Sequence, residues 1–247
     1  IKPRAMKVAL FVIFEQNLKM ELYTDAYFMN EAMKLAQIAF EDGEIPVGAI
    51  IVCRNKIIAK AYNQTEKLTD VTAHAEILAI TSAANALGAK YLTECQMYVT
   101  LEPCNHKGKT PPCTQAIIDA GIKKVVYSVS DPNPIAAGGG EHLRESGIEV
   151  EDGLLESEAT FDNRAWLTKI AKERPRVTWK IASTMDGKVA AADGTSKWIT
   201  SELARADVAL LRSQADAIVT STATVKADNP LLTSKGAGQN PVRIVMG

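Results

Sequence analysis

Three side chains that can bind zinc stand far apart in this sequence, and only a specific fold can bring them together. They are His74, Cys104 and Cys113, and eight residues separate the two cysteines. Zinc takes nitrogen and sulfur ligands tetrahedrally, and a catalytic site uses three protein ligands so that the fourth position holds water. Glu76 can move protons beside such a site. The sequence predicts a catalytic zinc site, with a structural zinc site and ordinary packing as the alternatives.

His74 and Glu76 are predicted to lie in the first turn of a helix. Apolar residues at helical spacing run over about 73–87, with Thr72 as the predicted cap and Gly88 at the end. The positive end of the helix dipole and the free backbone N–H groups favour negative charge at this position. The start of this helix is therefore expected to face the metal.

The two cysteines are predicted to reach the metal from a strand and from a second helix. Cys104 follows a strand predicted over 96–101, at the carboxyl end, where open α/β sheets bind ligands. Cys113 begins a helix predicted over 113–120, introduced by two prolines, and a helix N-terminus stabilises a thiolate. Two helix starts and one strand end are therefore expected to converge.

Other periodic segments predict an α/β architecture around this site. They are a helix over 25–41, antiparallel strands over 47–53 and 56–62, a strand over 123–129, a helix from the glycine triplet 138–140 to about 146, and a strand over 148–150. No Lys-Ser/Thr pair follows the triplet, which favours a flexible turn over a phosphate-binding loop.

Two domains are predicted from the length of 247 residues and from a change in composition. Residues 1–24 form a leader or extension, 25–168 the first domain, 169–176 a polar linker and 177–247 the second domain. The second domain is predicted to contain a strand over 177–182, a helix from Ser201 to about 213, and strands over 217–220 and from 242. The chain begins without Met and stops inside an apolar run, so both ends are expected to be truncated.

Composition and charge limit the classes of function. The formal net charge is −1, so no basic field indicates a nucleic-acid partner. The apolar run 8–14 is too short to span a bilayer and is expected to be a strand or part of a leader. Of the four cysteines, Cys53 and Cys95 border apolar runs and are expected to be core or strand-end residues. With no disulfide framework, a cytoplasmic location without membrane contact is expected.

The front of the chain resembles the bacterial tRNA adenosine deaminases. The resemblance covers about residues 25–104 and rests on Gly43-Glu-Ile-Pro-Val-Gly48, Tyr62-Asn63 and Asp70-Val-Thr-Ala-His-Ala-Glu76. In that family the two cysteines are separated by two residues, a spacing that this chain lacks. The resemblance implies that Asn63 contacts the base, although a turn residue at a strand end is the alternative.

From about residue 98 onward the chain resembles the bifunctional riboflavin-biosynthesis deaminase-reductases. The similar segments are 98–113, 130–134, 183–187, 196–200 and 224–230. Thr100-Leu-Glu-Pro-Cys104 is common to both families, so a chimera would be joined there. The Pro-Asn-Pro stretch that the riboflavin enzymes usually have before Val47 is missing.

Both resemblances imply an α/β fold with a cytidine-deaminase-like three-layer α/β/α domain, the same zinc ligands and the same glutamate. The expected function is hydrolytic deamination of 2,5-diamino-6-(5-phosphoribosylamino)pyrimidin-4-one in riboflavin biosynthesis. The alternatives are deamination of adenosine to inosine in tRNA and an inactive zinc-stabilised module. The riboflavin resemblance implies that the loop between the cysteines holds the ribose phosphate, with polar roles for His106, Lys109 and Thr110. It also implies a small-molecule partner, and a homo-oligomer is expected.

The rear segment resembles the beginning of a dihydrofolate-reductase-like, NADPH-dependent reductase domain. By position, the residues that would face the cofactor are Ala182, Trp198, Thr224 and Asp228. Those that would face the substrate are Ser196, Arg212, Leu232 and Lys235. Lys235 stands where that family commonly has arginine. A lysine cannot bind a phosphate in the bidentate geometry of an arginine. Because the later glycine-rich cofactor segment lies outside this sequence, no reductase activity is expected from the chain alone.

Overall fold

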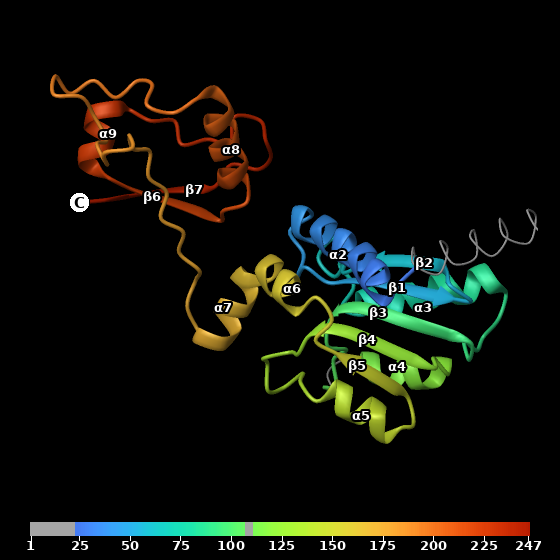
Figure 1. The fold of residues 1–247 in the computed structure, drawn as a ribbon. Helices are drawn as coiled ribbons and strands as arrows, with labels where there is room; N and C mark the ends of the chain where they lie inside the picture. Colours follow the sequence, from blue (N-terminus) through green and yellow to red (C-terminus); the bar gives the residue numbers. More distant parts are fainter. Residues whose placement is uncertain (1–22, 107–110) are drawn as a thin grey trace, which may run out of the picture. The chain divides into compact units, whose positions relative to one another are not determined.

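The computed structural model describes residues 23–106 and 111–247, so the apolar run 8–14 lies outside the described residues. The chain forms two compact units, residues 1–176 and 177–247 (Figure 1). In the described residues, no helix combines the length and the apolar character needed to cross a bilayer.

The first unit is built on a five-stranded sheet with the strand order β2-β1-β3-β4-β5 (Figure 1). The strands are β1 (Gly48–Cys53), β2 (Lys56–Tyr62), β3 (Cys95–Leu101), β4 (Lys124–Val129) and β5 (Glu149–Asp152). β1 pairs antiparallel with β2 and β3, whereas β3, β4 and β5 run parallel. The end of β2, the start of β1 and the end of β3 therefore share one edge of the sheet.

The β1–β2 hairpin turns through Arg54 and Asn55. Cys53 pairs with Lys56, so the loop has only two residues, and their φ angles are 50° and 59°. Positive φ at both positions is characteristic of the type I′ turn, whose twist matches that of the flanking strands. The predicted pair of antiparallel strands is confirmed.

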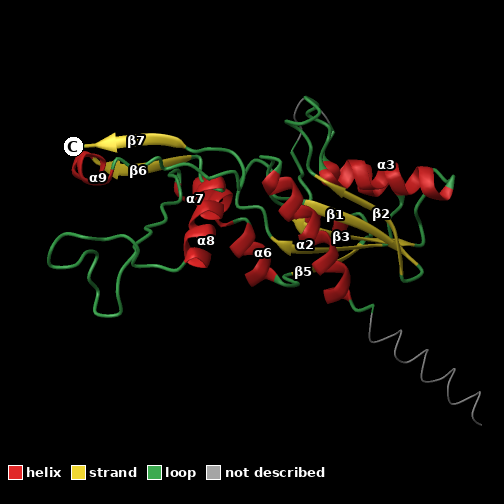
Figure 2. Cartoon of the chain, turned by 90° about the horizontal axis from the view of Figure 1, so that it is seen from above, coloured by secondary structure: helices red, strands yellow, loops and turns green. Residues whose placement is uncertain are grey.

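Helices cover both faces of the sheet, which gives three layers (Figures 1 and 2). They are α2 (Asp25–Glu41), α3 (Ala75–Leu87), α4 (Cys113–Ala120), α5 (Gly139–Glu145), α6 (Glu156–Asp162) and α7 (Arg164–Lys172). α2 packs on one face, and α3, α4 and α5 contribute to the core on the other. The three-layer α/β/α fold is thus confirmed, and α7 extends into the predicted linker.

The central strands are apolar on both sides because both faces of the sheet are covered. In β1, Ala49 and Ile51 join the core beneath α3, whereas Ile50 and Val52 join the core beneath α2. Successive side chains of a strand point to opposite faces, so a strand buried on both faces shows a continuous apolar run. This explains the unbroken run from Ala49 to Val52.

The start of α3 differs from the predicted one. His74, not Thr72, occupies the N-cap position, and α3 begins at Ala75. The backbone N–H and the hydroxyl of Thr72 both donate to Oδ1 of Asp70 at 2.8 Å. Thr72 therefore belongs to a side-chain-stabilised turn before the helix, because its hydroxyl is already committed to Asp70.

The second unit contains a two-stranded parallel sheet, β6–β7. Its elements are α8 (Glu202–Ser213), β6 (Ala217–Ser221), α9 (Thr222–Asp228) and β7 (Val242–Met246). Ser201 caps α8, since its hydroxyl accepts a hydrogen bond from the N–H of Ala204 at 3.2 Å. The predicted helix and the strands near 217 and 242 are confirmed, whereas α9 was not predicted.

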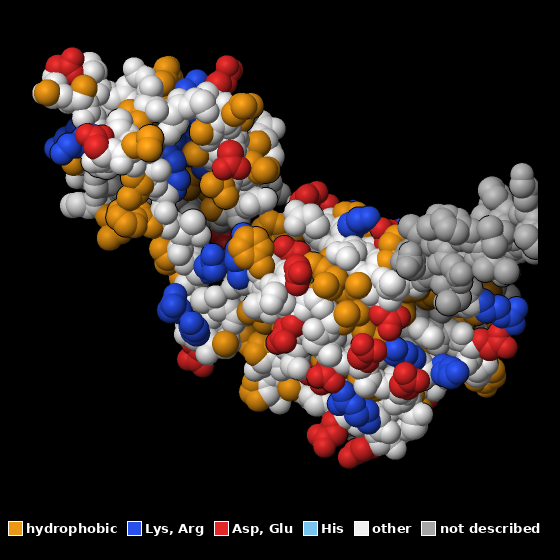
Figure 3. Space-filling view, viewed as in Figure 1, with side chains coloured by type: hydrophobic (Ala, Val, Ile, Leu, Met, Phe, Trp, Pro, Cys, Tyr) orange, Lys and Arg blue, Asp and Glu red, His pale blue; other side chains and the backbone are white. Residues whose placement is uncertain are grey.

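The strand predicted over 177–182 is wrong, because this described segment contains no strand. Its apolar side chains are open to solvent, with Val177 79% and Trp179 85% exposed. A strand needs neighbours for its backbone hydrogen bonds, and within the described part of this unit β6 and β7 pair only with each other. Figure 3 shows many exposed hydrophobic side chains on this unit, and interspersed acidic and basic ones on the visible face of the first unit.

Candidate metal centre

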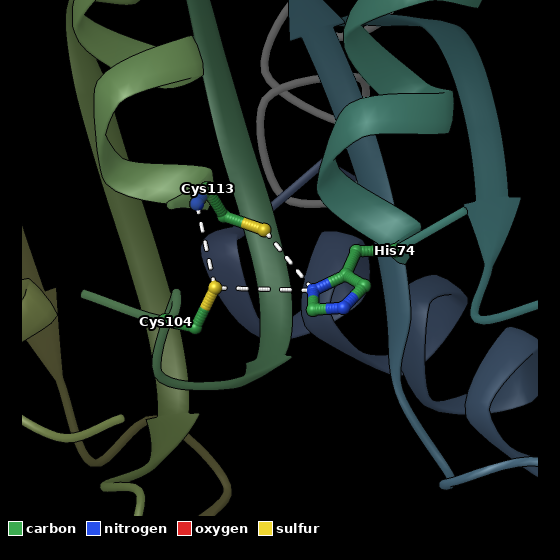
Figure 4. A group of neighbouring side chains, drawn as sticks. All are labelled: His74, Cys104 and Cys113. Atoms are coloured by element: carbon green, nitrogen blue, oxygen red, sulfur yellow. Dashed lines mark hydrogen bonds between the residues drawn. The ribbon is translucent and has the colours of Figure 1, made fainter. Parts of the chain in front are cut away.

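Three elements of the first unit bring His74, Cys104 and Cys113 together (Figure 4). His74 is the N-cap of α3, Cys104 follows the carboxyl end of β3, and Cys113 is the first residue of α4. Nδ1 of His74 lies 3.8 Å from Sγ of Cys104 and 3.3 Å from Sγ of Cys113. The predicted convergence of two helix starts and one strand end is confirmed.

The spacing of the three ligand atoms fits a tetrahedral zinc ion. With Zn–S near 2.3 Å and Zn–N near 2.0 Å, a tetrahedral angle places nitrogen and sulfur ligands about 3.5 Å apart. The observed distances of 3.3 and 3.8 Å lie on either side of this value, and all three ligand atoms lie within 4.8 Å of one another. One imidazole and two thiols form a donor set that zinc prefers.

The two thiols favour one shared negative charge before any metal binds. The side chain of Cys113 hydrogen-bonds to Cys104 and lowers the pKa of Cys104 to about 4, with a further contribution from His74. The same interaction raises the pKa of Cys113. The backbone N–H of Cys113 also donates to Sγ of Cys104 at 3.3 Å. This arrangement favours the thiolate form of Cys104 beside His74.

Glu76 lies in the first turn of α3 and is buried. Burial raises the pKa of its carboxyl to about 7, and the nearby charge of His74 only partly offsets this effect. A carboxyl with a pKa near neutrality can both accept and release a proton at physiological pH. Glu76 is thus suited to general acid and base chemistry beside the three ligands.

The loop that carries Cys104 is held by Glu102. This buried carboxylate accepts hydrogen bonds from the backbone N–H of Asp131 at 3.0 Å and from that of Gly140 at 2.8 Å. A Cβ atom on Gly139 would lie 1.8 Å from the carbonyl oxygen of Pro103. The glycine triplet therefore permits close packing against the metal-site loop, a role that the sequence analysis missed. Its signal was the triplet itself, which was interpreted as a flexible turn.

Asn63 follows β2 and is buried. Its side-chain NH₂ group donates to Oε2 of Glu44 at 3.0 Å and to the hydroxyl of Thr65 at 3.2 Å. The sequence analysis did not identify Glu44 as a partner, because the two residues are separated by a hairpin. Whether Asn63 contacts a substrate stays a prediction.

The loop between the cysteines is only partly described. His106 is half-buried, and among the described residues its buried Nδ1 has no hydrogen-bond partner. The start of the loop is fixed, since the N–H of Asn105 donates to the carbonyl of Ala136 at 2.9 Å. Lys109 and Thr110 lie outside the described residues.

The predicted substrate positions of the second unit come together only in part. Nη1 of Arg212 donates to the carbonyl of Thr233 at 3.3 Å, which places α8 beside the segment with Leu232 and Lys235. In the described part of the chain, no hydrogen bond links Ser196 to this group.

Two of the predicted cofactor positions, Trp198 and Thr224, contact residues close to them in the chain. The guanidinium of Arg205 lies 4.4 Å from the ring centroid of Trp198. The hydroxyl of Thr224 lies 3.1 Å from that of Ser221 at the start of α9, and Asp228 ends this helix. Ala182 is half-buried, whereas Trp198 and Asp228 are exposed. The roles of all these residues stay predictions.

A three-layer α/β/α sheet, with a histidine and two cysteines around one point and a buried glutamate beside them, defines the class of cytidine-deaminase-like zinc proteins. Residues 22–129 match the family described as the cytidine and deoxycytidylate deaminase zinc-binding region. Residues 175–247 match the RibD C-terminal domain. Zinc is thus the cofactor of the first unit, and the second unit is a dihydrofolate-reductase-like domain.

The chain is similar to RibD riboflavin biosynthesis proteins over most of its length. It is 45% identical to RibD of Mycobacterium tuberculosis over 208 residues, which cover 82% of this chain and 59% of the relative. It is also 45% identical to RibD of Escherichia coli over 212 residues, which cover 85% of this chain and 55% of the relative. The chain therefore spans little more than half the length of these relatives.

A solved structure gives the same result. The diaminohydroxyphosphoribosylaminopyrimidine deaminase/5-amino-6-(5-phosphoribosylamino)uracil reductase from Thermotoga maritima matches with a TM-score of 0.80 and 42% identity. The match covers 90% of this chain and 62% of that chain. Such a match extends to both sides of Cys104, and the junction suggested at that residue stays a prediction.

Proposed function

We propose that the first unit catalyses the zinc-dependent hydrolytic deamination of 2,5-diamino-6-(5-phosphoribosylamino)pyrimidin-4-one in riboflavin biosynthesis. The observation that carries the proposal is the meeting of His74, Cys104 and Cys113 with Glu76 beside them. The similarity to the Thermotoga maritima deaminase/reductase supports the choice of substrate.

In the proposed reaction, three side chains bind zinc and a fourth transfers protons. His74, Cys104 and Cys113 would hold zinc, which when bound lowers the pKa of water and so makes it a nucleophile near neutral pH. Glu76 would take a proton from the attacking water and deliver it to the leaving nitrogen, which departs as ammonia. Its pKa of about 7 allows both steps at the same pH.

Substrate binding is proposed for polar residues around the centre. His106, Lys109 and Thr110 would contact the phosphate, because cations and hydroxyl groups bind its oxygens directly. The unpartnered Nδ1 of His106, among the described residues, supports such a role. Asn63 would contact the heterocycle from the end of β2.

The second unit is proposed to be part of a reductase that uses NADPH. Ala182, Trp198, Thr224 and Asp228 would face the cofactor, and Ser196, Arg212, Leu232 and Lys235 the substrate. The match of residues 175–247 to the RibD C-terminal domain supports this proposal. A cytoplasmic location and a homo-oligomeric state are likewise proposed.

Ammonia release tests the deaminase proposal. The zinc-loaded protein is assayed side by side on the phosphoribosyl diaminopyrimidine and on a tRNA anticodon stem-loop. We expect ammonia only from the pyrimidine. Release from the RNA alone would favour tRNA adenosine deamination, and zinc near one per chain without release from either compound would favour an inactive zinc-stabilised module.

Replacing the proposed proton carrier separates chemistry from metal binding. Glu76→Gln removes the ionisable group but keeps the size of the side chain. We expect ammonia release to fall by at least about 100-fold, since general acid–base catalysis contributes about that much. Zinc content should stay near one per chain. A variant with unchanged turnover would remove Glu76 from the mechanism.

A further inference from the structure

A buried carboxylate organises the loop that connects β2 to α3. Oε1 of Glu44 accepts hydrogen bonds from the backbone N–H groups of Glu66 at 3.0 Å and Lys67 at 2.8 Å. Oε2 accepts from Nδ2 of Asn63 at 3.0 Å and from the hydroxyl of Thr65 at 3.1 Å. Glu44 and Asn63 are each only 5% exposed. One oxygen thus serves the backbone and the other serves the two side chains.

Asn63 lies at the edge of the sheet that carries the metal ligands. Tyr62, the last residue of β2, pairs with Gly48, the first residue of β1. The N–H of Gly48 donates to the hydroxyl of Thr100, near the end of β3, at 3.1 Å. Because Cys104 follows the same end of β3, Asn63 and Cys104 share one edge of the sheet.

The same loop also leads back to His74. The N–H of Gln64 donates to the carbonyl of Ala73 at 3.0 Å, which closes the loop at its base. Gln64 follows Asn63 and Ala73 precedes His74, so the backbone at Asn63 is tied to the backbone at a metal ligand. Hydrogen bonds therefore link the backbone around Asn63 both to the segment before His74 and to the end of β3.

The hydrogen bonds of Asn63 determine which atom it can offer to a ligand. Its NH₂ group has two hydrogens, and they are directed to Glu44 and to Thr65. A carboxylate only accepts hydrogen bonds, so the NH₂ group, not the carbonyl oxygen, must face Glu44. Oδ1 is then the atom of Asn63 that remains available as an acceptor.

We propose that Glu44 is a positioning residue that presents Asn63 to the ligand as a hydrogen-bond acceptor, so that the site selects heterocycles that offer an N–H donor to Asn63. The amino and ring N–H groups of a diaminopyrimidinone meet this requirement. This selection rests on the deamination proposed above, whereas the orientation of Asn63 rests on the hydrogen bonds alone.

Glu44→Gln tests the idea because it reverses the polarity of Asn63 while preserving the loop. Oε1 of the glutamine can keep both backbone hydrogen bonds, since these share one oxygen in the native residue. Its NH₂ group then replaces Oε2 and meets the NH₂ group of Asn63, donor against donor. Asn63 has to turn over, and it would present a donor to the ligand instead of an acceptor.

The double variant E44Q/N63D should restore an acceptor. One oxygen of the introduced carboxylate at 63 accepts from the glutamine at 44, and the other faces the ligand as Oδ1 does in the native protein. The net charge of the pair is unchanged, because the negative charge only moves from position 44 to position 63. Thr65 adapts in both variants, since a hydroxyl can donate or accept.

Kinetics of ammonia release from the phosphoribosyl diaminopyrimidine measure the effect on selection. We expect Glu44→Gln to lower kcat/KM by about 10- to 100-fold, as for a buried polar group left without its partner. The double variant should recover at least half of that loss on a logarithmic scale. Zinc content should match that of the native protein in both variants. Glu94→Gln, an exposed carboxylate paired with Arg54, is the control for charge removal.

A second measurement is independent of catalysis. In the ¹H–¹⁵N spectrum of the native protein, the NH₂ group of Asn63 should exchange with solvent more slowly than that of the exposed Asn85. In Glu44→Gln this protection should be lost. Equal exchange at Asn63 and Asn85 in the native protein would overturn the proposed orientation.

The two measurements distinguish the possible failures. If the native protein releases no ammonia, the proposed function is contradicted, and the exchange experiment still decides the orientation of Asn63. If ammonia is released and Glu44→Gln has native kcat/KM, the selection by Asn63 is contradicted. A loss in Glu44→Gln that the double variant does not reverse would reduce Glu44 to a structural residue and overturn the proposal.

Discussion

Gly139 lies so close to the carbonyl oxygen of Pro103 that a Cβ atom would come within 1.8 Å of it. The neighbour of Pro103 is Cys104, and Gly140 donates its N–H to Glu102 in the same loop. The start of α5 and the end of β3 are thus packed backbone to backbone. The loop that carries Cys104 thus packs against a glycine about 35 residues further along the chain.

We therefore expect Gly139→Ala to displace the loop that carries Cys104. Backbone atoms cannot yield as a flexible side chain can, so the free energy of unfolding should fall by at least about 1–3 kcal/mol. Zinc affinity, measured by competition with a chromophoric chelator, should fall as well. Ile135→Ala, an exposed site in the preceding loop, should change neither quantity. Native zinc affinity in Gly139→Ala would show that the contact does not control the metal site.

Removal of zinc should destabilise the first unit. Any ligand that binds only the folded state adds to its stability, by about 4 kcal/mol when its concentration is 1,000 times its Kd. Treatment with a chelator should lower Tm, and added zinc should restore it. Cys113→Ser should bind little zinc and show no response to the chelator, whereas Cys53→Ala should behave as the native protein. An equal response in all three proteins would contradict the proposed ligand set.

Glu102 should contribute to stability through its two backbone hydrogen bonds. In Glu102→Gln an amide NH₂ group would face either the N–H of Asp131 or that of Gly140, and one donor would lose its acceptor. A buried unsatisfied donor costs about 1–3 kcal/mol. Urea unfolding measures this loss, with the exposed Glu158→Gln as the control. A difference below about 0.5 kcal/mol between the two variants would contradict the argument.

The ion pairs of Glu31 should make a small, pH-dependent contribution to stability. Lys34 and Lys60 hold the pKa of Glu31 below its ordinary value of 4.5, and Nζ of Lys60 lies 2.6 Å from Oε2. A lowered pKa in the folded state means that the contribution is present above the unfolded pKa and is lost as pH falls through the folded pKa.

Glu31→Gln tests this contribution. At about pH 7 the free energy of unfolding should fall by less than about 1 kcal/mol, since both lysines are largely exposed. The difference from the native protein should shrink once the pH lies below the folded pKa of Glu31. Urea unfolding at several pH values measures it, and a difference that grows at low pH would contradict the sign of the effect.

Local sequence patterns were sufficient for most elements of the first unit. The helix over Asp25–Glu41, the strand over Lys56–Tyr62 and the helix over Cys113–Ala120 agree with the predicted bounds. Each has apolar residues at the period of its structure and a clear end signal. The prediction was wrong at Thr72, because its hydroxyl binds Asp70 instead of capping the helix. It was also wrong over 177–182, where the backbone has no neighbouring strand among the described residues.

The metal ligands were predictable for a different reason. Histidine and cysteine are rare in this chain, and a helix start or a strand end adjoins each of the three ligands. The sequence did not indicate in the same way which residues hold the loops around these ligands. Glu44 and Glu102 lie in the segments 43–48 and 100–104 that carry the resemblances, but their residue type and spacing do not indicate which groups their carboxylates bind.

The sequence by itself determined most elements of the first unit and the donor set of the metal centre, because these depend on residue type and on periodicity along the chain. Only the tertiary structure decided how the centre is supported. Glu102 accepts hydrogen bonds from the backbone of Asp131 and Gly140. Gly139 packs against Pro103, and Glu44 accepts a hydrogen bond from the amide of Asn63. These contacts depend on which backbone groups and side chains the folded sheet and its loops bring within hydrogen-bond distance, and that proximity is not a local property of the sequence.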